Sequence, residues 1–359
     1  MRVVSIRDIT QAIERGMVTV LGIAVLLALI LSVVIRNRDS MADIPLPLAP
    51  IADSTDGVVT ATWFGCTTLL FDDGETQILV DAFISRPTVT DYLLRRPVEN
   101  DIATINYFMH EYRVRRLAAI IPLQSHYDHA MDIGAIANRS NASILGSESS
   151  AQIGRGAGVP EDQIVVIGDG AEYQFGQFTV RFIESDHAPT GWRGSVPFAG
   201  TIDAPLETPA PISAWREGGS YVVVISHPTG TALVQGTAGM AKLEELNVDV
   251  AFLGVGMLSG LGGDYAERFW HASVTSTGAD VVIPIEFDDF TRPFGTTELL
   301  PRIVDDFGLT VERLLALRQT WDSNTGVYLP RFGEPIALFV TVEPESAPED
   351  TPESTSDGP

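Results

Sequence analysis

The stretch "LQSHYDHAMD" (123–132) carries the densest chemistry in this sequence. Two histidines and an aspartate fall within four residues of it: His126, Asp128 and His129. They directly follow the apolar run "LAAIIP" (117–122), which predicts a buried strand. Imidazole and carboxylate groups on a loop that leaves a strand can converge on one zinc, iron or manganese ion. A lone histidine is more often structural, but a carboxylate is costly to bury without a partner, so the cluster favours a metal site.

Composition sets the broad class of protein. The chain has 359 residues, 45% of them hydrophobic, which suits one large domain or two small ones. A net charge of −24 argues against nucleic acid as a partner, because nothing would neutralise the phosphates. The acidic end of the chain is rich in Pro, Ser and Thr and predicts a disordered tail over 344–359. The single cysteine, Cys66, excludes an internal disulfide, and we expect it to be a small apolar residue in a strand.

The N-terminal region contains an apolar run, "MVTVLGIAVLLALILSVVI" (17–35), which is 19 residues long and uncharged. This length matches the ~20 residues that a helix needs to cross a bilayer. We expect a single-pass transmembrane helix or uncleaved signal anchor here, after a short basic segment over 1–16. The alternative is a cleaved signal peptide, with "SMA" (40–42) as a small-residue cleavage site. Three arginines before the run and two after it favour a periplasmic or other extracytoplasmic body by a small margin.

The remaining chain reads as a Pro-rich linker over 36–56 and one domain over 57–343. Each half of this domain has short apolar strands first and helical patterns afterwards. The second half has predicted strands at 173–185, 221–227, 231–236, 248–256 and 280–287, and predicted helices near 264–277 and 297–307. This order predicts two sheets packed face to face, with helices outside them.

A long Pro- and Gly-rich stretch without periodicity joins the two halves, over 188–219. Loops of this length in a compact domain are typically lids or binding loops. Trp192 and Arg193 are therefore candidates for contact with a substrate. The alternative, weighted equally, is that the aromatic residues of this stretch fix the loop to the body.

Together these segments resemble the metallo-β-lactamase fold superfamily over roughly 57–343. The signature loop of that superfamily is His-x-His-x-Asp-His, and the corresponding segment here is "QSHYDH" (124–129). The stretch "TWFGCTTLLFDDGETQILVDAF" (62–83) resembles its opening strands, which end in an aspartate, here Asp81. Three later segments follow in the expected order: "ESDHAP" (184–189), "GTALVQGTAG" (230–239) and "VVIPIEFDDF" (281–290). The similarity is greatest to the ascorbate-6-phosphate lactonase-like branch, among bacterial members.

The resemblance implies a four-layer αββα sandwich, here preceded by one N-terminal transmembrane helix, and two sets of metal ligands. One metal would take the His-x-His pair and a third histidine, here Gln124, His126 and His187. The other would take the Asp-His pair and a last histidine, here Asp128, His129 and Glu286. The aspartate that bridges the two metals falls at Thr237, which has no carboxylate.

The residues found at these three positions, Gln124, Glu286 and Thr237, predict that only one of the two metal sites is complete. An amide is a weak ligand for zinc, whereas glutamate is a good one, so the set of Asp128, His129 and Glu286 keeps three credible ligands. We therefore expect one ion, zinc first, with manganese or iron as alternatives. Three protein ligands and an open position are typical of a catalytic metal site.

The sequence thus indicates a membrane-anchored or exported metal-dependent hydrolase that acts on a small-molecule ester, lactone or phosphodiester through a metal-activated water. Asp128 would bind the metal or orient the water. The membrane contact would be made by residues 17–35. The alternative is a catalytically degenerate protein of the same fold that serves as a binding or scaffold domain, because a fold does not fix a function.

Overall fold

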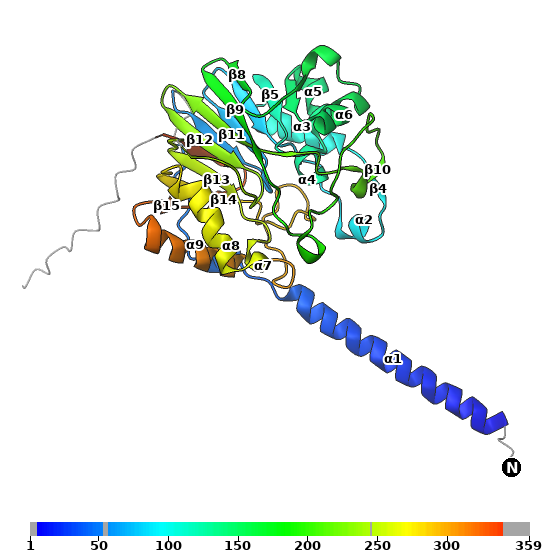
Figure 1. Ribbon diagram of the computed structural model, residues 1–359. Helices are drawn as coiled ribbons and strands as arrows, with labels where there is room; N and C mark the ends of the chain where they lie inside the picture. Colours follow the sequence, from blue (N-terminus) through cyan, green and yellow to red (C-terminus); the bar gives the residue numbers. More distant parts are fainter. Residues whose placement is uncertain (1–5, 53–56, 245, 340–359) are drawn as a thin grey trace, which may run out of the picture.

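Two seven-stranded sheets pack face to face, and helices cover their outer faces (Figure 1). This computed structural model describes residues 6–52, 57–244 and 246–339. The predicted tail over 344–359 lies outside these residues, as do positions 53–56 of the predicted linker. The two sheets and their helices form the expected four-layer αββα sandwich.

The first sheet comes from the first half of the chain and one strand from its far end. Its order is β16-β1-β2-β3-β5-β6-β7. The pairs from β16 to β3 are antiparallel, and those from β3 to β7 are parallel. The bounds are β1 Thr60–Trp63, β2 Leu69–Asp72, β3 Gln77–Val80, β5 Leu117–Ile121, β6 Ser143–Gly146, β7 Ile164–Val166 and β16 Pro335–Ala337.

The second sheet repeats this arrangement, as the sequence predicted. Its order is β15-β14-β13-β12-β11-β9-β8, with antiparallel pairs from β8 to β12 and parallel pairs from β12 to β15. The bounds are β8 Glu172–Phe175, β9 Phe178–Ser185, β11 Ser220–His227, β12 Gly230–Gln235, β13 Val250–Gly254, β14 Val281–Ile285 and β15 Gly326–Val327. Strands β4 (Pro97–Val98) and β10 (Ala210–Pro211) form a separate small pair.

The helices divide between the two sheets. The first sheet is covered by α3 (Ile102–Glu111), α5 (Ile133–Ser140) and α6 (Glu148–Gly156), and the second by α8 (Gly263–Trp270) and α9 (Phe307–Trp321). Three short helices lie in loops: α2 (Val89–Leu93), α4 (Tyr127–Ala130) and α7 (Leu258–Leu261).

The predicted helix near 297–307 is wrong, because these residues form turns and the helix starts at Phe307. Pro301 lacks a backbone N–H and disfavours a helix that continues through it. Asp306 caps α9 instead: its carboxylate accepts a hydrogen bond from Leu309 N at 3.0 Å.

Both faces of the first sheet are buried, which explains its nearly continuous apolar strands. In β2, Leu69 and Phe71 belong to the core between the sheets, whereas Leu70 belongs to the core under the helices. Successive side chains of a strand point to opposite faces, so both cores draw on the same short run. The rigid sandwich fixes the ends of the strands, where the candidate site lies.

Helix α1 (Ile6–Arg36) precedes the sandwich and contains the predicted span. Within its segment Glu14–Arg36, a stretch of 18 residues has a mean hydropathy of 3.1 and is not buried, so by length and composition the segment can cross a membrane. Residues 37–52 of the predicted linker lie against the body, where Ile44, Leu46 and Ala49 are buried. Ala49 N donates to Leu329 O at 2.8 Å. The end of α1 is therefore joined closely to the sandwich.

Candidate metal site

The predicted ligands all follow the carboxyl ends of strands, on one end of the sandwich. Asp81 follows β3, the loop 123–129 follows β5, and His187 follows β9. Thr237 follows β12, and Glu286 directly follows β14. The carboxyl ends of such strands are the usual ligand-binding edge of an α/β sheet.

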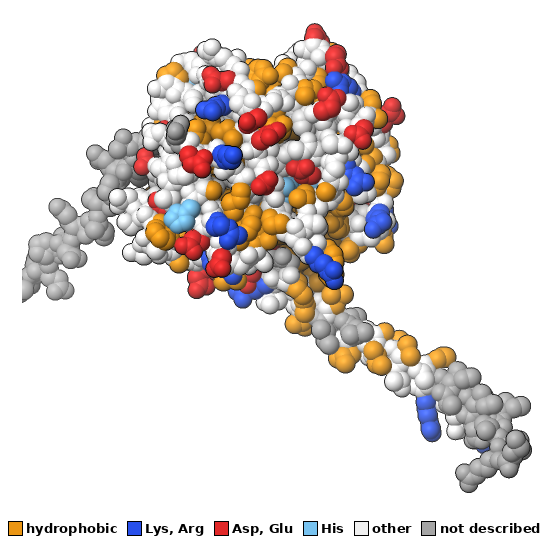
Figure 2. Space-filling model, in the orientation of Figure 1, with side chains coloured by type: hydrophobic (Ala, Val, Ile, Leu, Met, Phe, Trp, Pro, Cys, Tyr) orange, Lys and Arg blue, Asp and Glu red, His pale blue; other side chains and the backbone are white. Residues whose placement is uncertain are grey.

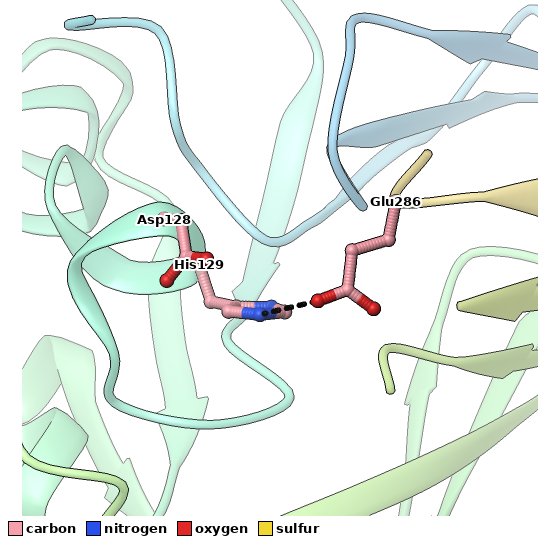
Figure 3. A group of neighbouring side chains, drawn as sticks. All are labelled: Asp128, His129 and Glu286. Carbon is pink, nitrogen blue, oxygen red and sulfur yellow. Dashed lines mark ion pairs between the residues drawn. The ribbon is translucent and has the colours of Figure 1, made fainter. Parts of the chain in front are cut away.

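Asp128, His129 and Glu286 come together at this edge (Figure 3). One ligand atom from each residue lies within 4.8 Å of the other two. The Nε2 atom of His129 is 3.9 Å from Oε1 of Glu286. Within the described residues, no other three His, Cys, Asp or Glu side chains meet this condition.

The imidazole of His129 is held in place by two residues from the opening strands. Its Nδ1 lies 2.7 Å from Oδ2 of Asp81 and 2.9 Å from the hydroxyl of Thr67. The Thr67 hydroxyl also donates to Asp81. The other carboxylate oxygen of Asp81 accepts from Leu123 N at 2.7 Å. This support directs Nε2 toward Glu286, in the way that outer residues orient metal-binding histidines.

The surroundings of His129 are strongly negative. Burial favours the neutral ring, but the carboxylates of Asp81, Asp128 and Glu286 outweigh this and raise the pKa of His129 to about 9. Burial raises the pKa of Glu286 well above its ordinary value. Oδ1 of Asp128 and Oε2 of Glu286 are buried and have no hydrogen-bond partner. Unpartnered carboxylate oxygens beside an imidazole nitrogen fit a bound metal cation.

The other predicted set does not converge in this way. Nε2–H of His126 donates to Pro197 O at 2.8 Å, and Nδ1–H of His187 donates to Ala188 O at 2.7 Å. The two rings are nearly perpendicular, with centroids 5.1 Å apart. Burial lowers the pKa of His126 to about 4, which keeps its ring neutral. One nitrogen of each ring is therefore hydrogen-bonded to a backbone carbonyl.

Gln124 explains why the first set is incomplete. Its amide nitrogen contacts Nε2 of His129, in the other set, and its Oε1 accepts a hydrogen bond from Ser220 at 3.2 Å. The amide therefore occupies the nitrogen that His129 would offer to a metal. Gln124 must turn away before His129 can act as a ligand.

A cavity of about 120 Å³ opens beside these residues. Its polar lining includes Gln124, His126, Asp128, His187, Thr237, Glu286, Cys66 and Asp288. Its apolar lining includes Tyr92, Tyr127, Phe198, Met257, Phe290 and Leu300. Thr190, Pro197 and Phe198 come from the predicted binding loop, 188–219, which forms one wall. Trp192 is 83% exposed, and neither it nor Arg193 lines the cavity.

The backbone takes unusual conformations around this cavity. Cys66, Asp81 and Glu286 have positive φ angles of 45°, 52° and 60°. Cys66 was expected in a strand, but it lies in the turn between β1 and β2, and its carbonyl accepts from Glu286 N at 2.8 Å. A Cβ on Gly254 would lie 2.7 Å from Oε2 of Glu286, so glycine makes room for this carboxylate. Such strained residues concentrate at functional sites.

Some residues of the site were not predicted from the sequence. Thr67, in the turn after β1, contacts His129, and Ser220, at the start of β11, contacts Gln124. Asp288 binds Cys66 N at 2.6 Å and lies 3.6 Å from Arg86, which fixes the turn at Cys66. No local pattern marks these residues, because each contact joins segments far apart in the sequence.

No protein-family model and no curated protein matches this chain. Solved structures match it at low identity. A metallo-beta-lactamase fold protein from Bacillus subtilis is 14% identical, with a TM-score of 0.42, over 77% of this chain and 98% of that one. A possible metal-dependent hydrolase from Veillonella parvula is 12% identical, with a TM-score of 0.46, over 78% and 100%. An isothiocyanate hydrolase from Delia radicum gut bacteria is 14% identical, with a TM-score of 0.46, over 77% and 98%.

The αββα sandwich, with its metal-type loop at the strand ends, has the architecture that the resemblance to the metallo-β-lactamase fold implied. Several solved structures similar to this chain are described as hydrolases or metal-dependent hydrolases.

Proposed function

We propose that this chain is a metal-dependent hydrolase that binds one divalent ion through Asp128, His129 and Glu286. The observation that carries this proposal is the pair of buried, unpartnered carboxylate oxygens beside the imidazole of His129. Zinc suits this set, and manganese or iron suits it also because two of the three ligands are carboxylates.

A metal ion at this position would supply Lewis-acid chemistry, polarising an ester oxygen and making water nucleophilic near neutral pH. The protein residues would provide the orientation. Asp81 and Thr67 hold the ring of His129, while Asp128 faces the cavity and can also orient a water molecule. The neutral rings of His126 and His187 lie on the same wall, where they can contact the substrate.

The cavity favours a neutral ester or lactone over a phosphodiester. The carboxylates of Asp128 and Glu286, each with one oxygen that has no hydrogen-bond partner, line it together with Asp288, which is paired with Arg86. No Lys or Arg among the described residues is part of the lining. Anionic phosphates in proteins are usually bound by such cations, and carboxylates would repel them. The aromatic and aliphatic lining suits the uncharged part of a small substrate.

Anchoring by helix α1 is part of this proposal. Its apolar segment is long enough for one span, and the small excess of arginine before it favours an extracytoplasmic body. Cleavage at 40–42 would remove Arg38, which contacts Glu298 and Leu299 O at 3.0 Å, and Asp39, which pairs with Arg302. These contacts favour an uncleaved anchor over a signal peptide.

The second candidate is a binding or scaffold domain without catalysis. The contact between Gln124 and His129 and the neutral residue at Thr237 favour this alternative. Elemental analysis of the purified full-length chain, combined with assays on neutral fluorogenic esters, separates the two. We expect about one tightly bound metal per chain and ester hydrolysis that a chelator abolishes. A chain that binds no metal and hydrolyses no ester would be a binding domain.

A further inference from the structure

The most exposed apolar side chains of the body are gathered in three segments. Outside α1, the four most exposed large hydrophobic residues among those described are Leu93 at 70%, Leu94 at 62%, Trp192 at 83% and Ile303 at 72%. The next is Tyr107, at 55%. We call the four residues the apolar rim. Exposed apolar groups that gather in this way mark a protein-binding or membrane-binding surface.

Each segment of the apolar rim adjoins, in sequence, a residue that lines the cavity. Leu93 and Leu94 directly follow Tyr92, which lines the cavity. Trp192 lies two residues after the lining residue Thr190, and Ile303 lies three residues after Leu300, which also lines it. Each part of the rim is therefore continuous in sequence with a wall of the cavity.

The same rim is tied to the end of helix α1. Arg302 N, beside Ile303, donates to Asn37 O at 2.9 Å, one residue after the helix ends. Arg38 donates to Leu299 O at 3.0 Å, beside the lining residue Leu300. Figure 1 shows α2, α7 and the end of α1 on one side of the body. In Figure 2, hydrophobic side chains cover much of the helix and also lie on the body near its root.

We propose that the apolar rim rests in the membrane surface where α1 ends, and that the substrate is an amphiphilic carboxylic ester or lactone that enters the cavity from the bilayer. This inference rests on the proposed hydrolase function. The occupant of the rim is lipid, because the rim adjoins the only helix among the described residues that can span a membrane. Trp192 suits the interface between water and lipid, and Leu93, Leu94 and Ile303 suit its apolar side.

The charge of Arg193 and the apolar residues that line the cavity agree with a rim that rests at the membrane surface. The guanidinium of Arg193 lies 5.7 Å from the ring centroid of Trp192, and such cations attract lipid headgroups. Tyr92, Phe198, Met257 and Leu300 are apolar lining residues of the cavity that can contact an acyl chain. Asp128, Glu286, His126 and His187 line the same cavity, where the ester group would reach them.

The reaction needs only water as a second reactant. The water oxygen forms a bond to the acyl carbon, and the bond from this carbon to the alcohol oxygen breaks. One proton of the water passes to the leaving alkoxide, and the products are a carboxylic acid and an alcohol. The chain of such an ester would remain partly in the bilayer while its ester group enters the cavity.

Lipid contact is tested on the full-length chain in phosphatidylcholine nanodiscs. The variants Leu93→Cys and Ile303→Cys are labelled with an NBD fluorophore, with Tyr107→Cys on α3 as the control. Cys66 is 1% exposed, so the added thiol reacts selectively. We expect doxyl-labelled phosphatidylcholine to quench the fluorophore at 93 and 303 and not at 107. Equal quenching at all three positions, or none at 93 and 303, would overturn the inference.

The substrate class is tested with two esters of one fluorophore, methylumbelliferyl palmitate in the nanodiscs and methylumbelliferyl acetate in solution. The variant Leu93→Ser/Leu94→Ser/Ile303→Ser should lose about 10-fold or more of the palmitate turnover and keep the acetate turnover, because three apolar contacts with lipid are lost. The control Tyr107→Ser/Val166→Ser should change neither. Unchanged palmitate turnover, or equal loss for both esters, would contradict a bilayer-borne substrate.

The two proposals fail in different ways. If the unmodified chain hydrolyses neither ester, the hydrolase function is wrong, and the substrate class falls with it. The quenching measurement then still decides whether the rim lies in the membrane. If the chain hydrolyses acetate while the palmitate rate is insensitive to the rim, the hydrolase function stands and the bilayer-borne substrate does not.

Discussion

Two sets of side chains lie at the same edge of the sandwich, and their surroundings differ completely. In one set, His126 and His187 each donate a ring N–H to a backbone carbonyl, and burial lowers the pKa of His126 to about 4. In the other, His129 lies among three carboxylates that raise its pKa to about 9. One environment favours a neutral ring, and the other favours a positive charge.

This contrast shows that the charges around an imidazole, as well as its place in a motif, decide whether it can help to bind a cation. Asp81, Asp128 and Glu286 concentrate negative charge on one side of the loop. A metal ion at Nε2 of His129 would replace a proton there and satisfy the free oxygens of Asp128 and Glu286. The side of His126 offers no comparable charge to a cation.

The largest loss of metal affinity is expected when a residue of the set Asp128, His129 and Glu286 is removed. Glu286→Ala should weaken metal binding by about 100-fold or more, because it removes one of three ligands. Isothermal titration of the metal-free full-length chain measures this change. The matched variant, His187→Ala, should have a much smaller effect. If His187→Ala weakens metal binding as much as Glu286→Ala does, both sets of side chains bind the metal.

A smaller effect should follow when the support of His129 is removed. Asp81→Asn keeps the size of the side chain but removes a charge 2.7 Å from Nδ1 of the ring. We expect a loss of about 10–100-fold in metal affinity, as for other residues that orient a metal-binding histidine. The pKa of His129, followed by NMR, should fall in the same variant. An unchanged pKa would mean that Asp81 does not set the charge of the ring.

Metal binding should also depend on pH in a defined direction. With a pKa of about 9, the ring of His129 carries a proton near neutral pH, and a metal must displace it. The apparent affinity should therefore rise with pH, by up to about 10-fold per unit, and level off near pH 9. Titrations at several pH values with a non-chelating buffer measure this slope. An affinity that does not change with pH would exclude His129 as a ligand.

The smallest change in metal affinity is expected for a substitution of Gln124, which belongs to the set of His126 and His187 but contacts His129 of the other set. Gln124→Ala removes the amide from Nε2 of His129 and should strengthen metal binding by about 3-fold, because the metal no longer has to displace a polar side chain from this nitrogen. Gln124→His should instead raise the number of bound metals, because it would add a nitrogen beside His126 and His187. Elemental analysis of both variants gives the stoichiometry. If both variants keep the affinity and the metal content of the unmodified chain, Gln124 does not limit metal binding.

The contents of the site were partly predictable from the sequence. The loop 123–132 and the strand before it are local patterns, so Asp128 and His129 could be named from them. Glu286 was assigned from the resemblance alone. Thr67 could not be named, because its contact with His129 exists only after β1, β2 and the loop have packed. The turn at Cys66 was missed for the same reason, because Asp288 fixes it from a distant segment. The start of α9 was missed although its cap, Asp306 to Leu309 N, is a local signal.

The sequence by itself determined the alternating apolar runs, the two-half order of strands and helices, and a span-length apolar helix, because each depends on neighbours within a few turns or strands. Only the tertiary structure decided which ligands meet. Five strand ends come to one edge of the sandwich, and their register brings Glu286 to His129 and turns Gln124 onto its nitrogen. It also decided that Tyr92 of α2 and Leu300 line one cavity, and that the backbone at Arg302 is joined to the end of α1. These are contacts between distant segments, and their geometry is set by how the two sheets pack.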